Sequence, residues 1–315
     1  MFPVVFSKLP RTKLLRIISL LALASVLQAC SAVKTAYSQA PTLAYFYLNG
    51  YVDFNDAQAT QVKAELGKFQ AWHRQTQLPV YVELLQKVQQ KMPQDLTASQ
   101  ACEVFADVRQ KVLTMTTHAE PAIAGVAATL MGPQLDAMQR KFAKGNITWR
   151  EDYLNGTTKY MREKREKSAV KRADMLYGSV NDRQRDLIAQ QVEKSRFNAL
   201  RSYTERQRRQ KDVLQTLAKV ASTSTSTSNA SATATASGTP SSPDTAALQT
   251  EMRNLLSRSV ASPDSAYRSY LEVVTQDGCA NFAELHNTTT PEQRKKAVQV
   301  LAGYEQDFRL LMNQR

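Results

Sequence analysis

The 315-residue chain is poor in glycine (10), proline (11), cysteine (3) and histidine (3). So few turn-forming residues argue against a β-sandwich or barrel, whose many short strands need frequent turns. None of the histidines, His73, His118 and His286, has a second metal-type ligand three or four residues away, so no zinc site is expected. The sequence also lacks a Gly-x-Ser-x-Gly motif and a glycine-rich phosphate loop. We therefore expect no enzyme, no cofactor and no metal site.

The residues that are plentiful, Gln, Ala, Leu, Lys, Glu and Arg, are good helix formers. They predict an all-α protein, an elongated multi-helix domain. The apolar spacing and the stop signals place helices at 55–76, 80–91, 97–117, 121–131, 133–144, 148–177, 181–220 with a break near 195–198, 244–260, 263–285 and 291–313. The last helix has one apolar stripe facing a partner, formed by Ala297, Leu301, Tyr304, Phe308 and Leu311.

The N-terminus has the three parts of a secretory signal: a basic start, an apolar run from Leu14 to Leu27, and small residues at the cut. The alternative, a transmembrane anchor, needs about 20 apolar residues, and this run is shorter. The end of the run, Leu27-Gln28-Ala29-Cys30, resembles the lipobox of bacterial lipoproteins. That resemblance implies cleavage before Cys30 and acylation of its sulfur and amino group. Ser31, where the family's inner-membrane retention signal is Asp, implies the outer membrane, facing the periplasm, although surface display stays open.

Composition divides the rest of the chain. Residues 221–243 are almost all Ser, Thr and Ala, which bury too little apolar surface to fold. One interpretation is a linker between two domains, but the part that follows is short, so we expect one domain with an insertion. The expected parts are a signal peptide (1–29), a tether (30–41), a main helical region (42–220), a disordered linker (221–243) and C-terminal helices that pack on the main region (244–315).

Two cysteines remain besides Cys30. In an oxidising periplasm, Cys102 and Cys279 are expected to form a disulfide, which would tie the C-terminal segment to the main region. The alternative is a pair of small buried thiols.

Positive charge is concentrated in one region. The net charge is +13, and removal of Lys8, Arg11, Lys13 and Arg16 with the signal leaves +9. Residues 139–211 hold 20 Lys or Arg and 9 Asp or Glu. Export disfavours nucleic acid as the partner, so acidic clients, acidic polymers or anionic lipids are expected instead. The alternative is a solvated, salt-bridged helix surface. The candidate basic face comprises Arg162, Lys164, Arg165, Lys171, Arg172, Arg206, Arg208 and Arg209.

An aromatic segment, residues 43–54, follows the tether. Tyrosine suits a membrane–water boundary, so the segment could lie on the membrane. We favour the alternative that these rings begin the core, because the helix that starts at Asn55 needs a surface to pack on.

Four sites share the pattern of a capping box, in which an Asn or Thr caps the helix and a Gln three residues later reaches back to the cap. By themselves they are helix starts and need have no other role. They are Asn55 with Gln58, Thr97 with Gln100, Asn181 with Gln184, and Thr290 with Gln293.

Two resemblances follow from these residues. Leu96-Thr97-Ala98-Ser99-Gln100 resembles the LTxxQ motif of Spy/CpxP-type periplasmic stress proteins, which implies an ATP-independent chaperone or stress-sensor modulator. This chain differs in its lipobox and in being about twice as long. The short motifs at residues 51–58, 71–74, 176–178, 262–267 and 285–294, and their order along the chain, are similar to those of a family of uncharacterised proteobacterial lipoproteins. This resemblance implies a helical periplasmic protein and adds no activity.

We therefore expect a lipid-anchored, non-enzymatic protein that binds unfolded or acidic envelope proteins through its basic face. A structural adaptor that docks one envelope assembly is the competing hypothesis. Its candidate surfaces are the aromatic segment and the C-terminal apolar stripe. Direct contact with anionic lipid is a third. The sequence gives no oligomeric state.

Overall fold

The structure, a computed structural model, describes residues 33–232 and 243–314. These residues form an all-α protein without strands. Residues 33–38 are helical, and the first half of the chain continues with α2 (Ala40–Val52), α3 (Asp56–Trp72), a π-helical turn (His73–Gln77), α4 (Leu78–Lys91), α5 (Ala98–Ala127) and α6 (Gly132–Tyr153). The second half contains α7 (Thr158–Tyr177), α8 (Asp182–Glu193), α9 (Ala199–Ala232), α10 (Pro243–Val260), α11 (Ser265–Asn287) and α12 (Pro291–Met312).

Several predicted helix ends were wrong. The predicted separation near 117–121 is absent, because Pro121 lies inside the continuous helix α5. Gly145 and Asn146 do not end a helix but lie within α6, and the break comes instead at residues 154–157. The break expected near residues 195–198 is present between α8 and α9.

The boundaries of the predicted tether and linker also differ from the structure. Residues 33–38 are helical, and Tyr37 is held against α3 and the π-helical turn, since Gln70 of α3 donates to its carbonyl and its hydroxyl lies 3.0 Å from His73 Nδ1. The linker predicted from residue 221 begins as helix, because α9 continues to Ala232. Extending an existing helix adds one hydrogen bond per residue, so helix spreads into a weakly favourable sequence. Residues 1–32, with the predicted signal and Cys30, and residues 233–242 lie outside the described part of the chain.

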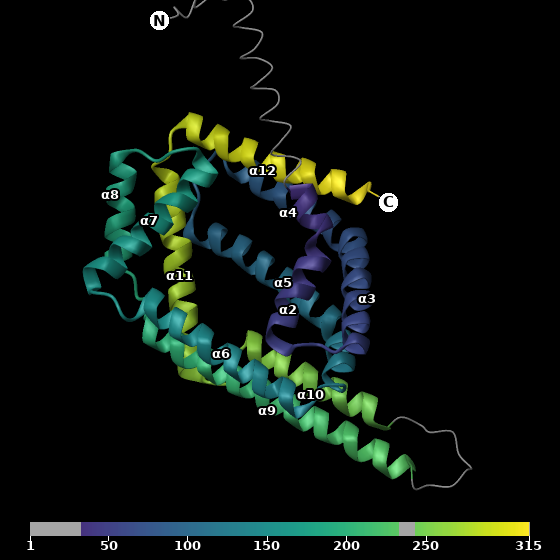
Figure 1. Cartoon of the computed structure of the whole chain (residues 1–315). Coiled ribbons are helices and arrows are strands. Elements are labelled where there is room, and N and C mark those ends of the chain that lie inside the picture. Colours follow the sequence, from purple (N-terminus) through teal and green to yellow (C-terminus); the bar gives the residue numbers. More distant parts are fainter. Residues whose placement is uncertain (1–32, 233–242, 315) are drawn as a thin grey trace, which may run out of the picture.

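Figure 1 shows the helices arranged as a frame. Helices α4 and α12 lie along the top, α7, α8 and α11 at the left, α6, α9 and α10 along the bottom, and α2 and α3 at the right. Helix α5 crosses the middle and packs on α3, α10 and α11. The chain after residue 242 therefore packs on the part before it.

The helix contacts reveal two equivalent halves. In the first half α2 packs on α3 and α6, and α3 packs on α5. In the second half α7 packs on α8 and α12, and α8 packs on α11. Each half also packs one helix on the other half: α4 of the first half packs on α12, and α9 of the second half packs on α6. Helix α10 is an addition to the second half, and α5 and α11 pack against each other where the halves meet.

The core consists of two hydrophobic clusters, and each includes helices from both halves, with α9 and α10 in the first and the end of α4 in the second. The first joins α2, α5, α6, α9 and α10, and its buried members include Val52, Met138 and Met252. The second joins α7, α8, α11 and α12, and its buried members include Tyr177 and Ala297. Burial of such side chains is the main favourable contribution to folding.

The C-terminal stripe faces α4 rather than an outside partner. Ala297 and Leu311 are fully buried, and the ring of Phe308 lies 6.2 Å from that of Tyr81 on α4. Tyr304 is the exposed member of the stripe. Most of this candidate adaptor surface is therefore used in folding.

The predicted disulfide is present. Cys102 of α5 and Cys279 of α11 are bonded, with their Cα atoms 5.3 Å apart and 177 residues between them in sequence. It links the two helices that pack where the halves meet.

Candidate functional site

All four predicted capping boxes are present. In three of them the glutamine also forms hydrogen bonds with a glutamine at the start of another helix. Gln58 Nε2 donates to Gln134 Oε1 at 3.2 Å, and Gln134 Nε2 donates back to Gln58 Oε1 at 2.7 Å. Gln58 also donates to the Thr129 carbonyl, and Gln134 to the Asp53 carbonyl. Gln134 was not predicted as a site residue, although the Met131 N–H donates to its Oε1 as in a capping box.

The second half contains the same cluster. Gln184 and Gln293 exchange two hydrogen bonds of 2.9 Å. Gln184 donates to the carbonyl of Thr288, and Gln293 donates to that of Ser179. The acceptors lie at the same offsets as in the first cluster: five residues before the second glutamine and two before the first cap. The two glutamine clusters thus pair α3 with α6 and α8 with α12, as equivalent structural joints.

The segment with the full LTxxQ form behaves differently. Thr97 and Gln100 make a capping box, and Thr97 is exposed. The turn before it is held by Asn287, whose side chain accepts from the Leu96 N–H at 2.8 Å and donates to the Leu96 carbonyl at 3.0 Å. These motifs therefore position helix ends, and their geometry gives no sign of chemistry.

His286 is a buried structural group. Its Nε2–H donates to the Gln94 carbonyl at 2.8 Å, so Nδ1 accepts from the Tyr177 hydroxyl at 2.9 Å. Burial lowers the pKa of His286 and raises the pKa of Tyr177. A neutral imidazole with both nitrogens hydrogen-bonded is a packing element that joins α7, α11 and the turn before α5.

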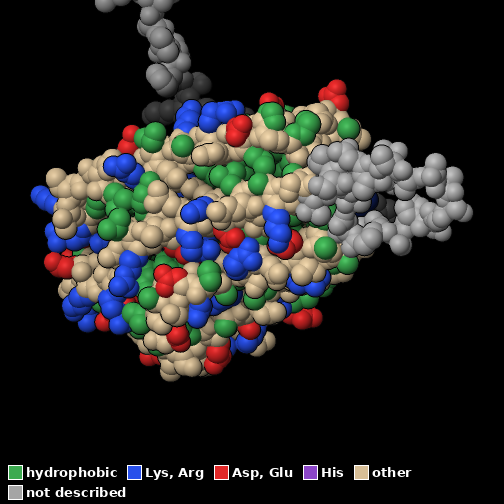
Figure 2. Space-filling view, turned by 90° about the horizontal axis from the view of Figure 1, so that it is seen from below, with side chains coloured by type: hydrophobic (Ala, Val, Ile, Leu, Met, Phe, Trp, Pro, Cys, Tyr) green, Lys and Arg blue, Asp and Glu red, His purple; other side chains and the backbone are tan. Residues whose placement is uncertain are grey.

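The candidate basic face is divided between two parts of the molecule. Its members on α7 lie at the left of Figure 1 and those on α9 lie along the bottom. On α7, Arg162 pairs with Glu193, Lys164 pairs with Asp152, and Arg165 lies over the ring of Phe197. Lys171 and Arg172 are exposed. Figure 2 shows positive and negative side chains interspersed over the lower face, rather than one basic patch.

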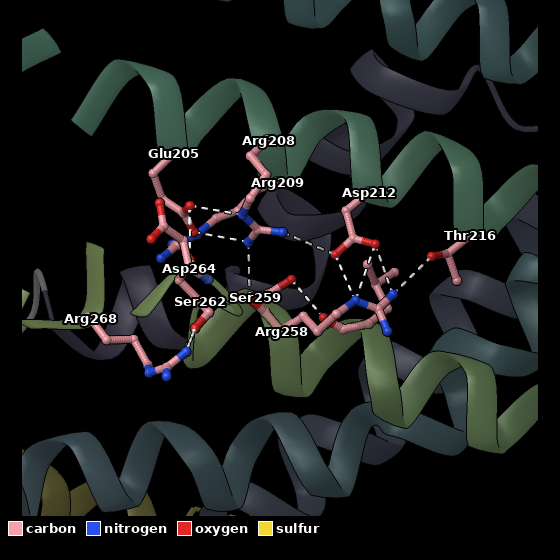
Figure 3. Close-up of polar contacts among 11 residues, drawn as sticks. Glu205, Arg208, Arg209, Asp212, Thr216, Arg258, Ser259, Ser262, Asp264 and Arg268 are labelled. Atoms are coloured by element: carbon pink, nitrogen blue, oxygen red, sulfur yellow. Dashed lines mark hydrogen bonds and ion pairs between the residues drawn. The ribbon is translucent and has the colours of Figure 1, made fainter. Parts of the chain in front are cut away.

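On α9, Arg208 and Arg209 belong to an ion-pair network with α10 (Figure 3). Arg208 donates two hydrogen bonds to Glu205, at 2.8 and 2.9 Å, and Arg209 donates one at 2.8 Å. Arg258 of α10 donates to both carboxylate oxygens of Asp212, at 2.9 and 2.8 Å. Arg208, which also donates to the Arg258 carbonyl, and Arg258 tie the two helices together, whereas Arg209 pairs with Glu205 within α9.

The network shifts the titration of its acids. Burial alone would raise the pKa of Glu205, but hydrogen bonds from Arg208, Arg209 and Ser262 outweigh it and the pKa falls below its usual value. The hydrogen bonds from Arg258 lower the pKa of Asp212. A carboxylate with a lowered pKa stabilises the fold above its unfolded-state pKa, and this contribution is lost as the pH falls.

Substitution Glu205→Gln is therefore expected to lower the free energy of unfolding by about 2–3 kcal/mol at pH 7, because Arg208 and Arg209 lose a partner that is 4 % exposed. The estimate is reduced from the value for a fully buried pair because both arginines are partly exposed. Urea unfolding between pH 7 and pH 3 measures it. The wild-type chain should lose stability as the pH drops below about 4.5, and the variant less steeply. Equal slopes would contradict the network's role.

An open apolar stripe lies on α5. Phe105, Val108 and Val112 are 63 %, 49 % and 46 % exposed, and their spacing of three and four residues places them on one side of the helix. Other parts of α5 are packed, since Cys102, one turn before Phe105, bonds to α11 and Ala124 lies in the core. We call these three residues the α5 stripe.

The described residues show no group of three His, Cys, Asp or Glu side chains that could hold a metal ion. Within the same part of the chain, no helix combines the length and the apolar character needed to cross a membrane. Open hollows are present in the described part of the chain. One, of about 570 Å³, lies beside Pro93 and Pro291, and another, of about 290 Å³, lies between α2 and α6. Neither contains a nucleophile–base pair among its lining residues.

Comparison with protein-family models gives one match, to a family of unknown function, DUF6279, over residues 50–227. This range is more than half of the chain. The chain belongs to the DUF6279 family. The DUF6279 match begins near the end of α2, contains α3 to α6 and continues through α7 and α8 into α9, so it includes the first glutamine cluster and the start of the second. No curated protein and no solved structure matches the chain.

Proposed function

We propose that this DUF6279 protein is a lipid-anchored envelope protein that binds other proteins without catalysis, as a holdase for clients with exposed apolar segments. It would be anchored through Cys30 to the outer membrane and face the periplasm. The α5 stripe is the observation that carries the proposal. Monomeric proteins do expose single apolar residues, but a row of three on one rigid helix is typical of an interaction site.

The stripe is held rigid before any partner binds. Cys102, one turn before Phe105, is bonded to α11, and α5 also packs on α3 and α10. Lys87 of α4 also pairs with Asp107 of α5 at 2.8 Å. Binding therefore orders little of this protein, which reduces the entropic cost of association.

The described ion pairs change the surface expected from the sequence. Arg208 and Arg209 are tied to Glu205, and Arg162 and Lys164 have acidic partners. A client would have to displace these partners in order to bind there. The apolar stripe has no such competitor among the described contacts, so we assign client binding to α5 and a secondary role to the remaining cations.

The test replaces Phe105, Val108 and Val112 together with serine. The variant should need about ten times more protein to suppress aggregation of a chemically denatured client, because it loses apolar area worth at least about 1.4 kcal/mol. Light scattering with the mature chain measures this at low and high salt. Because the stripe is apolar, the wild-type protection should persist at high salt.

A matched control variant carries serine at three equally exposed apolar positions on other helices, Tyr160, Met175 and Leu200. It should protect as well as the wild-type chain. Equal loss in both variants, or no protection by the wild-type chain at any ratio, would overturn the proposal.

One observation favours an adaptor as the second candidate. The stripe continues toward the partly buried Met115, so positions 105, 108, 112 and 115 repeat at intervals of three and four. This spacing fits one amphipathic helix of a single partner. An adaptor would not protect unrelated denatured proteins, so the aggregation measurement separates the two functions.

A further inference from the structure

Helix α2 is apolar on both sides, and one side is uncovered. Its thirteen residues include no charged side chain. Val52 lies in the first core cluster, and Tyr45 stacks on Phe54. On the other side Leu43, Phe46 and Tyr47 are 59 %, 64 % and 66 % exposed. The aromatic segment 43–54 thus divides, with some rings in the core as expected and others at the surface.

The uncovered side of α2 leads into a basic hollow. The hollow of about 290 Å³ is lined by Gly50 and Tyr51 of α2 and by three exposed cations of α6, Arg140, Lys141 and Lys144. Lys141 Nζ lies 5.6 Å from the centre of the Tyr51 ring, and the Tyr51 hydroxyl lies 3.5 Å from that of Tyr47. Asp53 is the one acidic residue among the eight that line the hollow. The exposed rings and the cations therefore form one continuous surface.

This surface lies close to the proposed acylation site. Cys30 precedes the first described residue by three positions, and helix occupies residues 33–38 and continues from Ala40. An extended residue spans at most about 3.5 Å and a helical residue about 1.5 Å, so Leu43 lies within roughly 30 Å of Cys30. Tyr37, bonded to His73, fixes this segment against α3. An acylated Cys30 would thus bring the outer side of α2 to the membrane surface.

We propose that Leu43, Phe46 and Tyr47, together with Arg140, Lys141 and Lys144, form a membrane-contact surface for anionic phospholipid headgroups. Aromatic side chains favour the membrane–water boundary, and cations beside them attract lipid phosphates. The surface gives the chain one orientation on the membrane rather than free rotation about its lipid anchor. The inference rests on the proposed anchoring for its location in the cell, but lipid binding by this surface can be measured without acylation.

The experiment measures sedimentation of the mature chain, from Ser31 onward, with vesicles of phosphatidylethanolamine alone or with one quarter phosphatidylglycerol. This chain retains every residue that the structure describes. Binding is expected only to the anionic vesicles and should weaken as salt rises past the screening range. Replacing Arg140, Lys141 and Lys144 with glutamine should weaken it about fivefold per cation, on the order of a hundredfold in all. Serine at Leu43, Phe46 and Tyr47 should weaken it at least tenfold.

The control for charge replaces three exposed cations of α7 with glutamine, Lys167, Lys171 and Arg172. This variant loses the same charge and should lose little binding. Equal loss of binding in both charge variants would mean that only the net charge of the chain matters, and this would overturn the proposal. Absence of binding of the wild-type chain to anionic vesicles would overturn it as well. Circular dichroism at matched temperature checks that each variant remains folded.

A cross-comparison separates this inference from the client-binding proposal. The α5 stripe variant should bind vesicles like the wild-type chain, and the α2 variant should suppress aggregation like the wild-type chain. Loss of lipid binding in the α5 variant would contradict the inference alone. A mature chain that binds vesicles but suppresses no aggregation would refute the proposed function and still support the membrane-contact surface.

Discussion

Replacing both Cys102 and Cys279 with serine is expected to lower the free energy of unfolding by about 4–5 kcal/mol. The disulfide closes a loop across 177 residues, and the entropy that it removes from the unfolded chain grows with loop length. Because it joins α5 to α11, its loss should also loosen the contact between the two halves. Urea unfolding of the mature chain, with and without a reducing agent, measures the effect.

The reducing agent supplies the internal control for this prediction. It should destabilise the wild-type chain by a similar amount and leave the cysteine-free variant unchanged. A loss below about 1.5 kcal/mol would mean that the disulfide restricts the unfolded chain little and that the packing of α5 on α11 fixes the native structure without the bond.

Substitution Gln184→Ala should lower the free energy of unfolding by about 3–4 kcal/mol. Gln184 is 1 % exposed, and its side chain bonds to the Asn181 N–H, the Thr288 carbonyl and Gln293. Its removal leaves buried polar groups unpaired, each at a cost of about 1–3 kcal/mol, and creates a cavity. Chemical unfolding of the variant and of Gln293→Ala measures these losses.

Two comparisons make the glutamine prediction specific. Gln100→Ala removes a glutamine that caps its helix without reaching another one, so it should cost only about 1 kcal/mol. The double variant at Gln184 and Gln293 should be less destabilised than the sum of the single variants, by at least about 1 kcal/mol, because the two side chains share two bonds. Strict additivity would contradict the pairing.

The fold class and many helix starts could be predicted because they depend on local chemistry. Asn55, Asn181 and Thr290 each satisfy the N–H groups of the helix that follows, which a short sequence window reveals. Helix ends were harder. Gly145 lies inside α6, where Arg206 of α9 approaches it, and packing of α9 along α6 overrides its weak helix propensity.

The relation between the halves could not be predicted from local patterns. Gln58 meets Gln134, and Gln184 meets Gln293, across 76 and 109 residues of sequence. Gln134 follows Met131 rather than a Ser, Thr, Asn or Asp cap, so the usual capping pattern did not identify it. A search for the spacing of Thr129 before Gln134 and Thr288 before Gln293 would have found the repeat.

The candidate surfaces show the same limit. The charge count found the basic region 139–211, but the partners of Arg208 and Arg258 depend on how α9 meets α10. The spacing of the α5 stripe is the same as that of apolar residues on a helix that faces a core. Only the packed structure shows that Phe105 is exposed. Sequence periodicity reveals that a helix has an apolar side, and tertiary packing decides whether that side is covered.

The most direct test places a photo-crosslinking residue at position 105, the most exposed member of the α5 stripe, in cells under envelope stress. The control carries the same residue at position 200, which is equally exposed on α9. The account predicts crosslinks from position 105 to many envelope proteins and few from position 200; one dominant product would instead favour the adaptor. No crosslinked protein at position 105, or the same products from both positions, would contradict the claim that the α5 stripe binds other proteins.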